Sequence, residues 1–382
     1  MGGLAERASL IESLREDDPG LVLLDTGDLF GVDDKPRKAE AVLDVYRLAV
    51  YDLIALGDQD LLGGEMTPAR LLGELPFACA NLTPLANDRP PFPATLILER
   101  GGVKVGLVAV IHPDCFATGP DLAALGYGVS DWHEPLREAV EGLEAAGCDI
   151  VIVLSHLGVP GEVEIAENFP QVDLVVGGHS GLFRRQPELE YAAPIVWPGR
   201  KGRYVGVVRL SLDHDTFGHL LSYEAIPVDG EVLEVDPATR AVILAYERER
   251  YEDWLARFYK PEGDYAWHGA DYCGACHAEQ YAQWSRTPHA LAWESLVATG
   301  DDRNLECIRC HATGFGRPGG FGSLELTPHL TEVGCQMCHE TPAEHPAGEP
   351  PPAVEARICA VCHKPGYDDD FSFSRDAEFI KH

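Results

Sequence analysis

The chain has 382 residues, a hydrophobic content of 45% and a formal net charge of −32 at pH 7. This length fits two domains or more. The strong negative charge disfavours nucleic acids as partners. It favours basic redox partners or, as the preferred interpretation, simply keeps the protein in solution. No apolar run approaches the ~18 residues of a membrane-spanning helix, so the sequence predicts no membrane span.

Strands and helices alternate through the first 228 residues. Helices are predicted at 4–16, 37–50 and 134–146, where apolar residues recur at helical spacing. Strands are predicted at 21–25, 53–56, 77–81, 95–99, 103–111, 149–156, 173–177, 204–212 and 219–227. This order is typical of a layered α/β domain, which we place at 1–228.

Four polar side chains follow predicted strands at their carboxyl ends: Asp28, Asp58, His156 and His179. Open α/β sheets place their ligands at such strand ends. Taken singly, each residue fits a helix cap or a loop. As a set, Asp and His side chains suit a divalent ion, and they predict one metal site for Zn, Mn or Fe.

This pattern resembles the calcineurin-like metallophosphoesterases of the 5′-nucleotidase branch. The matching motifs are Leu24-Asp-Thr-Gly-Asp28, Gly57-Asp-Gln-Asp60, Leu154-Ser-His156 and Gly177-Gly-His-Ser180. The resemblance implies a layered β-sandwich flanked by helices. It also implies two metals that activate a water for attack on phosphorus. Asp28 would bridge both metals, and one of them would also be held by Asp58, His156 and His179.

Departures from that family predict a degenerate site. The Asp-x-His motif that opens the family has no counterpart before the first predicted helix. The family's catalytic His is Gln59, which cannot donate as a cation. The last ligand of its Gly-His-x-(His/Gln) motif is Gly181, which has no ligand atom. The family's nucleotide-binding domain is also missing, and we expect at most one metal position.

The last third of the chain, 267–382, follows a helical linker predicted at 229–266. It holds four Cys-x-x-Cys-His motifs: Cys273–Cys276–His277, Cys307–Cys310–His311, Cys335–Cys338–His339 and Cys359–Cys362–His363. Each is typical of a covalent c-type haem site, in which two thiols bond to haem and the histidine is the proximal ligand. Zinc is the alternative, but zinc does not require a His after every second Cys. The motifs therefore predict four covalently bound haem c groups.

The second axial ligands are expected to be histidines. Of three methionines, Met1 and Met66 are distant in sequence and Met337 lies inside a motif. The spare histidines of this region are His268, His289, His329, His345 and His382. The remaining cysteines, Cys79, Cys115 and Cys148, lie in apolar surroundings and are expected to be buried structural thiols.

The C-terminal segment resembles the tetrahaem cytochrome c-554 family and is predicted to be mostly α-helical. The resemblance rests on Tyr272-Cys-Gly-Ala-Cys-His, Thr287-Pro-His-Ala-Leu-Ala-Trp293, Cys310-His-Ala-Thr-Gly314 and Ile380-Lys-His382. It implies distal ligands at His289, His345 and His382, with one haem left five-coordinate. His329 remains an alternative ligand for that iron, although the chain would have to fold back to bring it there.

Covalent haem is attached outside the cytoplasm, so a secretory signal is expected. The first residues contain no apolar core and no cleavage site. We therefore expect a periplasmic or otherwise extracytoplasmic protein whose export signal and first strand precede the given chain.

These observations predict a tetrahaem electron-transfer protein fused to a degenerate metallophosphoesterase domain, with redox proteins as partners. One alternative is an active phosphohydrolase, which Asp28, His156 and His179 favour and Gln59 and Gly181 oppose. A second alternative is redox catalysis at an open haem, and it rests on family analogy alone.

Overall fold

The computed structural model of the protein describes residues 3–31, 36–61, 75–86, 92–117, 121–212, 220–228, 233–339, 353–364, 368 and 370–381. The chain divides into two compact units, Met1–Val242 and Ile243–His382. None of the described helices is both long enough and apolar enough to cross a lipid bilayer.

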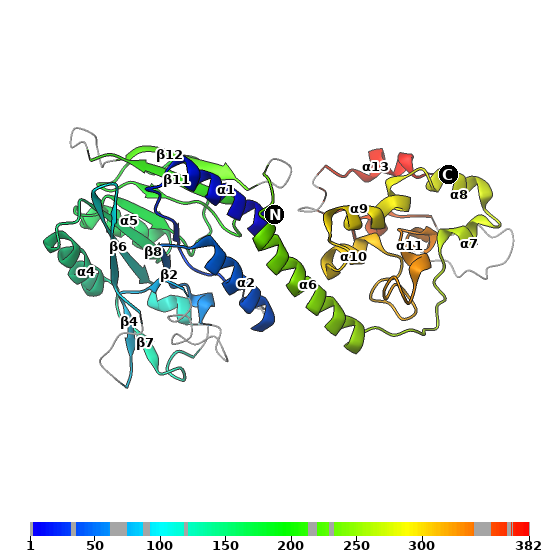
Figure 1. The fold of residues 1–382 in the computed structure, drawn as a ribbon, viewed down its shortest axis with the longest axis horizontal. Helices are drawn as coiled ribbons and strands as arrows, with labels where there is room; N and C mark the ends of the chain where they lie inside the picture. The colour runs from blue at the N-terminus through cyan, green and yellow to red at the C-terminus, as the bar shows by residue number, and fades with distance from the viewer. Residues whose placement is uncertain are drawn as a thin grey trace. The chain divides into compact units, whose positions relative to one another are not determined.

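The first unit contains two main sheets (Figure 1). The smaller one is parallel, in the order β1 (Leu24–Asp25), β2 (Leu53–Ala55), β3 (Phe77–Ala78). The larger one runs β10 (Ile195–Val196), β9 (Leu174–Gly177), β8 (Ile150–His156), β6 (Val103–Ile111), β5 (Thr95–Arg100). In it only the β5–β6 pair is antiparallel. Two antiparallel pairs accompany the sheets: β4 (Leu82–Pro84) with β7 (Tyr127–Val129), and β11 (Tyr204–Leu210) with β12 (Leu220–Pro227).

Helices cover the outer faces of both sheets. α4 (His133–Ala145) and α5 (Val159–Asn168) pack on the larger sheet through a core that includes Leu136, Val153 and Ile165. α1 (Leu4–Asp17) and α2 (Pro36–Ala49) contribute Ile11 and Leu43 to a core on the smaller sheet. A third core lies between the sheets and includes the residues Leu53, Ala78, Leu107 and Ile152. Full burial of each large aliphatic side chain stabilises the fold by about 1.5–3 kcal/mol.

Two sheets packed face to face, with helices on their outer faces, confirm the predicted β-sandwich flanked by helices. Strand β8 shows why the prediction was accurate: all seven of its residues are buried, as an unbroken apolar run in a central strand requires. α5 was not predicted. It starts after Gly158, which has a φ of 77°, and carries Pro160 in its first turn. Proline is favoured in the first turn of a helix. In the sequence alone, however, the pair Gly158 and Pro160 indicates a turn, so the helix was missed.

The second unit consists of short helices around a small apolar core. The long helix α6 (Pro237–Arg257) starts in the first unit, where Asp236 Oδ1 accepts a hydrogen bond from the Thr239 N–H over 2.7 Å, and extends into the second. The other helices are α7 (Ala270–Gly274), α8 (Ala278–Trp284), α9 (Ala292–Thr299), α10 (Leu305–His311), α11 (Cys335–His339), α12 (Ala356–Cys359) and α13 (Phe373–Asp376). The apolar core comprises seven buried residues: Tyr251, Trp293, Leu296, Ile308, Ala312, Phe321 and Leu330.

The 3-10 helices are η1 (Asp58–Asp60), η2 (Pro113–Phe116), η4 (Pro288–Leu291), η5 (Pro328–Leu330) and η6 (Ala377–Phe379). The domain boundaries predicted at 228 and 266 stay predictions.

Candidate metal centre and haem cavity

The four predicted metal ligands converge at the carboxyl ends of their strands. Asp28 follows β1, Asp58 follows β2, His156 ends β8 and His179 follows β9. One ligand atom from each lies within 4.8 Å of the others. His156 Nε2 is 3.2 Å from Asp58 Oδ1 and 3.5 Å from Asp28 Oδ2, and His179 Nδ1 is 3.5 Å from Asp58 Oδ1. The arrangement fits one divalent ion held by two imidazoles and two carboxylates.

The tautomer of His156 suits metal binding. Its side chain is 1% exposed, and its Nδ1 lies 2.9 Å from the Thr26 carbonyl oxygen. A carbonyl only accepts, so Nδ1 carries a proton and Nε2 can present its lone pair to a metal. The backbone of strand β1 and the loop after it thus orient a ligand from β8.

Two of the four residues have strained backbones. Asp28 has a φ of 58° and His179 a φ of 25°, in the left-handed region that L-residues rarely adopt. Such a conformation costs about 1–3 kcal/mol and is concentrated at functional sites. Here the two strained residues, Asp28 and His179, both belong to the group of four predicted metal ligands.

Charge coupling shifts the pKa values of the group. Burial alone raises the pKa of Asp58, but hydrogen bonds with His156 and His179 outweigh it and hold that pKa well below the usual range. The hydrogen bond to Asp58, followed by the contact with Cys115, raises the pKa of His179 to about 10. Burial raises the pKa of Asp28. The two carboxylates therefore require positive charge nearby, from protonated imidazoles or from a metal ion.

Two neighbours of the group organise its loops. Gln59 contacts both carboxylate oxygens of Asp28, through its backbone N–H and its side-chain amide. Asp60 is fully buried and accepts hydrogen bonds from the N–H groups of Asp28, Leu29 and Gly57. Burial, followed by the nearby charge of Asp28, raises the pKa of Asp60 to about 7. Asp60 was quoted in the predicted motif, but its structural role could not be read from the sequence.

The structure also reveals residues that the sequence analysis missed. Cys115 Sγ lies 3.7 Å from His179 Nδ1, and the residue is half-buried. The prediction of a buried structural thiol was wrong for Cys115 and Cys148, which are both half-buried, whereas Cys79 is buried. Cys115 and His179 line a cavity of about 560 Å³ together with His112, Asp131, His133 and Glu164. His133 bridges two carboxylates there, with Nδ1 2.6 Å from Asp131 and Nε2 2.9 Å from Glu164.

In the second unit, short helices carry the Cys-x-x-Cys-His motifs. Cys273 lies on α7, the second motif ends α10, the third motif forms α11, and Cys359 ends α12. A cavity of about 1750 Å³ is lined by the motif residues Cys307, Cys310, His311, Cys338, Cys359, Cys362 and His363 and by the predicted distal ligand His289.

Thiols from different motifs lie side by side. The Cys310 thiol lies beside that of Cys362, and the Cys273 thiol lies beside that of Cys335. The first motif thus meets the third, and the second motif meets the fourth. The sequence order of the motifs did not predict this pairing.

The lining of the cavity fits covalent haem. Its thiols and imidazoles are the groups that bond to haem vinyls and to iron. Trp267 also lines the cavity, and its buried indole N–H has no hydrogen-bond partner among the described residues. A haem propionate is an acceptor of the kind that such a donor requires.

His289 lies opposite His363. Their ring centroids are 6.0 Å apart and the rings are inclined at 71°. Metal–imidazole bonds are about 2 Å long, so this separation suits two rings on opposite faces of one metal. Burial, followed by the charges of His363 and His311, lowers the pKa of His289 and keeps its ring neutral.

The other predicted distal ligands are His345, His382, His329 and His268. His345 and His382 are outside the described residues. His329 lies on η5 and is exposed, and it is not among the residues that line the cavity in the described part of the chain. His268 stacks on Tyr272, with ring centroids 4.0 Å apart.

Comparison with known proteins gives independent information on each unit. Residues 272–340 match the family described as cytochrome c554 and c-prime. Cytochrome c-554 of Nitrosomonas europaea is 34% identical over 91 residues, which cover 20% of this chain and 39% of that protein. The Mus musculus 5′-nucleotidase is 27% identical over 245 residues, which cover 60% of this chain and 41% of the relative.

Solved structures support the fold of the first unit. The sulfate thiohydrolase SoxB of Thermus thermophilus aligns with a TM-score of 0.59 at 23% identity, over 68% of this chain and 48% of that one. A 5′-nucleotidase precursor, also from Thermus thermophilus, aligns with a TM-score of 0.57 at 22% identity, over 69% of this chain and 56% of that one.

The chain spans about half or less of the length of these curated relatives. Together, the matches show that the chain has an N-terminal α/β region similar to 5′-nucleotidases and calcineurin-like phosphoesterases, followed by a C-terminal cytochrome c554 domain.

Proposed function

We propose that this protein is an extracytoplasmic tetrahaem electron carrier whose α/β region retains a single metal position. The observation that supports it most is the cavity of about 1750 Å³, whose walls bring together cysteines of three motifs with His311, His363 and His289. Haem supplies one-electron chemistry when it is bound at such sites. The seven-residue apolar core of the second unit is small, so bound haem would provide much of its interior.

The residues of the cavity have separate roles in this proposal. The motif cysteines would hold each haem covalently, and the motif histidines would be iron ligands. His289, beside His363, would be a second ligand to the iron that His363 holds. An iron held by two imidazoles would need little rearrangement to gain or lose an electron. The charge of −32 favours basic redox proteins as donors or acceptors.

The proposed single metal position rests on Gly181, which has a φ of 63° and offers no ligand atom. Gln59 donates two hydrogen bonds to the Asp28 carboxylate. Asp28, Asp58, His156 and His179 would hold one ion. Gly181 would give no ligand to the second ion of a two-metal clamp on phosphorus.

Haem stoichiometry tests the main proposal. Intact mass of the purified full-length protein should exceed the polypeptide mass by four haems, and a denatured gel should retain haem stain. The double variant Cys359→Ala, Cys362→Ala should lose one haem. Cys148→Ser, a thiol outside the cavity, should lose none. Fewer than four haems in the wild type, or haem released on denaturation, would contradict the proposal.

A metal-dependent hydrolase is the second candidate. The observation that favours it is the cavity of about 560 Å³ beside the four-residue group, with His179 in its wall. We expect weak turnover or none with nucleotides. Hydrolysis at about 1–1000 per second, abolished in His156→Ala, would establish the hydrolase and overturn the degenerate interpretation.

A further inference from the structure

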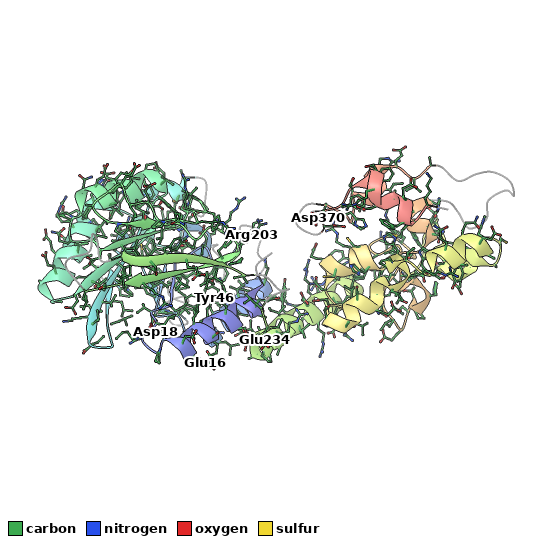
Figure 2. The ribbon with its side chains drawn as sticks, turned by 90° about the horizontal axis from the view of Figure 1, so that it is seen from above. Glu16, Asp18, Tyr46, Arg203, Glu234 and Asp370 are labelled. Atoms are coloured by element: carbon green, nitrogen blue, oxygen red, sulfur yellow. The ribbon has the colours of Figure 1, made fainter. Side chains whose placement is uncertain are left out.

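The segment after the fourth motif holds the His363 ring on two sides. Asp368 Oδ2 lies 2.6 Å from His363 Nδ1. The Phe371 ring stacks on His363 with centroids 4.5 Å apart and planes inclined at 18°. On a third side lies His289, at the distance described above. Asp370, labelled in Figure 2, belongs to the same segment.

The second motif offers an internal comparison. His311 Nδ1 lies 2.7 Å from the Ala292 carbonyl oxygen and 3.2 Å from Ser295 Oγ. Both of these partners are neutral, whereas the partner of His363 is a carboxylate. Two proximal histidines in one cavity thus differ in the charge of the group that holds Nδ1.

This difference has an electronic consequence. An ionised carboxylate only accepts hydrogen bonds, so His363 Nδ1–H must be the donor and Nε2 is left for iron. A charge-assisted bond of this kind is stronger than a neutral one. A negative charge behind the imidazole stabilises ferric over ferrous iron, because the ferric state carries one more positive charge.

The arginine of this segment pairs with another carboxylate. Arg375 donates two hydrogen bonds to Asp376, of 2.5 Å from Nε and 2.8 Å from Nη2. Arg375 also donates to the Asp370 carbonyl over 2.6 Å. Asp376 is therefore the main partner of the guanidinium, and the direct partner of Asp368 is the His363 ring.

We propose that Asp368 is a positioning residue that lowers the reduction potential of the haem attached at Cys359 and Cys362 below that of the haem at Cys307 and Cys310. The inference rests on the proposed haem function. In the step concerned, one electron from a neighbouring ferrous haem or a reduced partner protein converts Fe(III) to Fe(II). No bond forms or breaks, and the proton stays on Nδ1 of His363.

Redox titration of the full-length haem-loaded protein tests the proposal. Asp368→Asn keeps an oxygen acceptor for Nδ1 but removes the charge. One of the four midpoint potentials should then rise by about 59 mV, which is a tenfold change in the equilibrium constant of a one-electron reduction. Asp368→Glu should restore most of the low potential. Ser295→Ala, which alters a neutral neighbour of His311, should leave the component that responds to Asp368 unchanged.

The components are assigned with variants that lack one pair of attachment cysteines. The variant without Cys307 and Cys310 should lack the midpoint potential of the second-motif haem. The variant without Cys359 and Cys362 should lack that of the fourth-motif haem. If the midpoint potential of the fourth-motif haem is not lower than that of the second-motif haem, the inference is overturned. This comparison needs only the wild type and the cysteine variants, so it holds even if Asp368→Asn fails to load haem. Four unchanged potentials in Asp368→Asn overturn it as well. Either result leaves the proposed electron carrier intact, whereas fewer than four haems in the wild type would refute that function itself.

Discussion

The side-chain amide of Gln59 donates a hydrogen bond to Asp28 Oδ2 over 2.9 Å, and the Gln59 backbone N–H donates to Oδ1 over 3.0 Å. Both oxygens of the carboxylate that would bridge two metals thus have a partner from one residue. Gln59 therefore fixes the orientation of the Asp28 carboxylate, and one lone pair on each oxygen stays available for a metal.

The first prediction concerns metal stoichiometry. Full-length protein stripped with a chelator and reloaded with zinc or manganese should bind one equivalent beyond its haem iron, as measured by elemental analysis. His156→Ala should lose it, because this buried imidazole contacts both carboxylates. His133→Ala is the matched control from the neighbouring cavity and should retain it. Two equivalents in the wild type, or one in His156→Ala, would count against a single site at this position.

The second prediction concerns pH and the metal-free protein. The pKa of His179 is raised to about 10, so its contribution to stability is complete below the unfolded value of about 6.5 and is lost as pH rises towards 10. The pKa of Asp58 is lowered, so its contribution is complete above about 3.9 and is lost on further acidification. In thermal unfolding with a chelator present, the stability that His179 and Asp58 contribute, measured as wild type minus variant, should therefore be greatest between about pH 4 and 6.5.

His179→Gln should flatten the alkaline side of that profile, and Asp58→Asn should flatten the acidic side. Added zinc should reverse the alkaline slope, because metal binding requires deprotonated ligands and stabilises the folded state. Identical alkaline slopes in wild type and His179→Gln would show that the coupling does not operate.

The third prediction concerns iron ligation. His289→Ala should convert one low-spin haem to a high-spin haem in the electron paramagnetic resonance spectrum of the oxidised protein, because the ring opposite His363 is removed. His329→Ala should leave the spectrum unchanged, since His329 is exposed and not among the cavity-lining residues described. If His329→Ala lost a low-spin signal and His289→Ala left the spectrum unchanged, His329 and not His289 would be the distal ligand.

The fourth prediction uses two glycines. A Cβ at Gly27 would lie 2.5 Å from the Gly57 backbone nitrogen, and its φ is 87°. Gly101 has a φ of 57° but no atom within 4 Å of an added Cβ. Gly101→Ala should cost about 1–2 kcal/mol of unfolding free energy, as expected for a left-handed residue with a side chain. Gly27→Ala should cost clearly more and weaken metal binding, because it displaces the loop that carries Asp28. Equal costs in denaturant unfolding would contradict this.

Local patterns were enough to predict most of the fold. The apolar run of Ile150–His156 is long enough to require a buried strand, and the helical spacing in 134–146 places α4 within one residue of its observed bounds. Strand ends also predicted which four side chains would meet, since parallel strands bring their carboxyl ends to one edge.

The missed features depend on tertiary contacts. Cys115 lies next to His179 because η2 follows β6, and β6 pairs with β8 in a register that places Ile111 beside His156. The bond between Asp368 and His363 is a side-chain contact that no local sequence pattern indicates. Neither Cys115 nor Asp368 belongs to a periodic pattern or a motif, so their roles could not be predicted from spacing.

The interleaving of the haem motifs limits how the cytochrome segment can be divided. The region around the first motif is hydrogen-bonded to the region before and within the third: the His268 N–H donates to Gln336 over 2.7 Å, and the Trp284 indole donates to the Val333 carbonyl over 3.0 Å. Thiols of the second motif meet those of the fourth. A cut between the second and third motifs would separate both pairs of contacting motifs. We therefore expect the segment to fold as one module, and neither half to bind haem on its own.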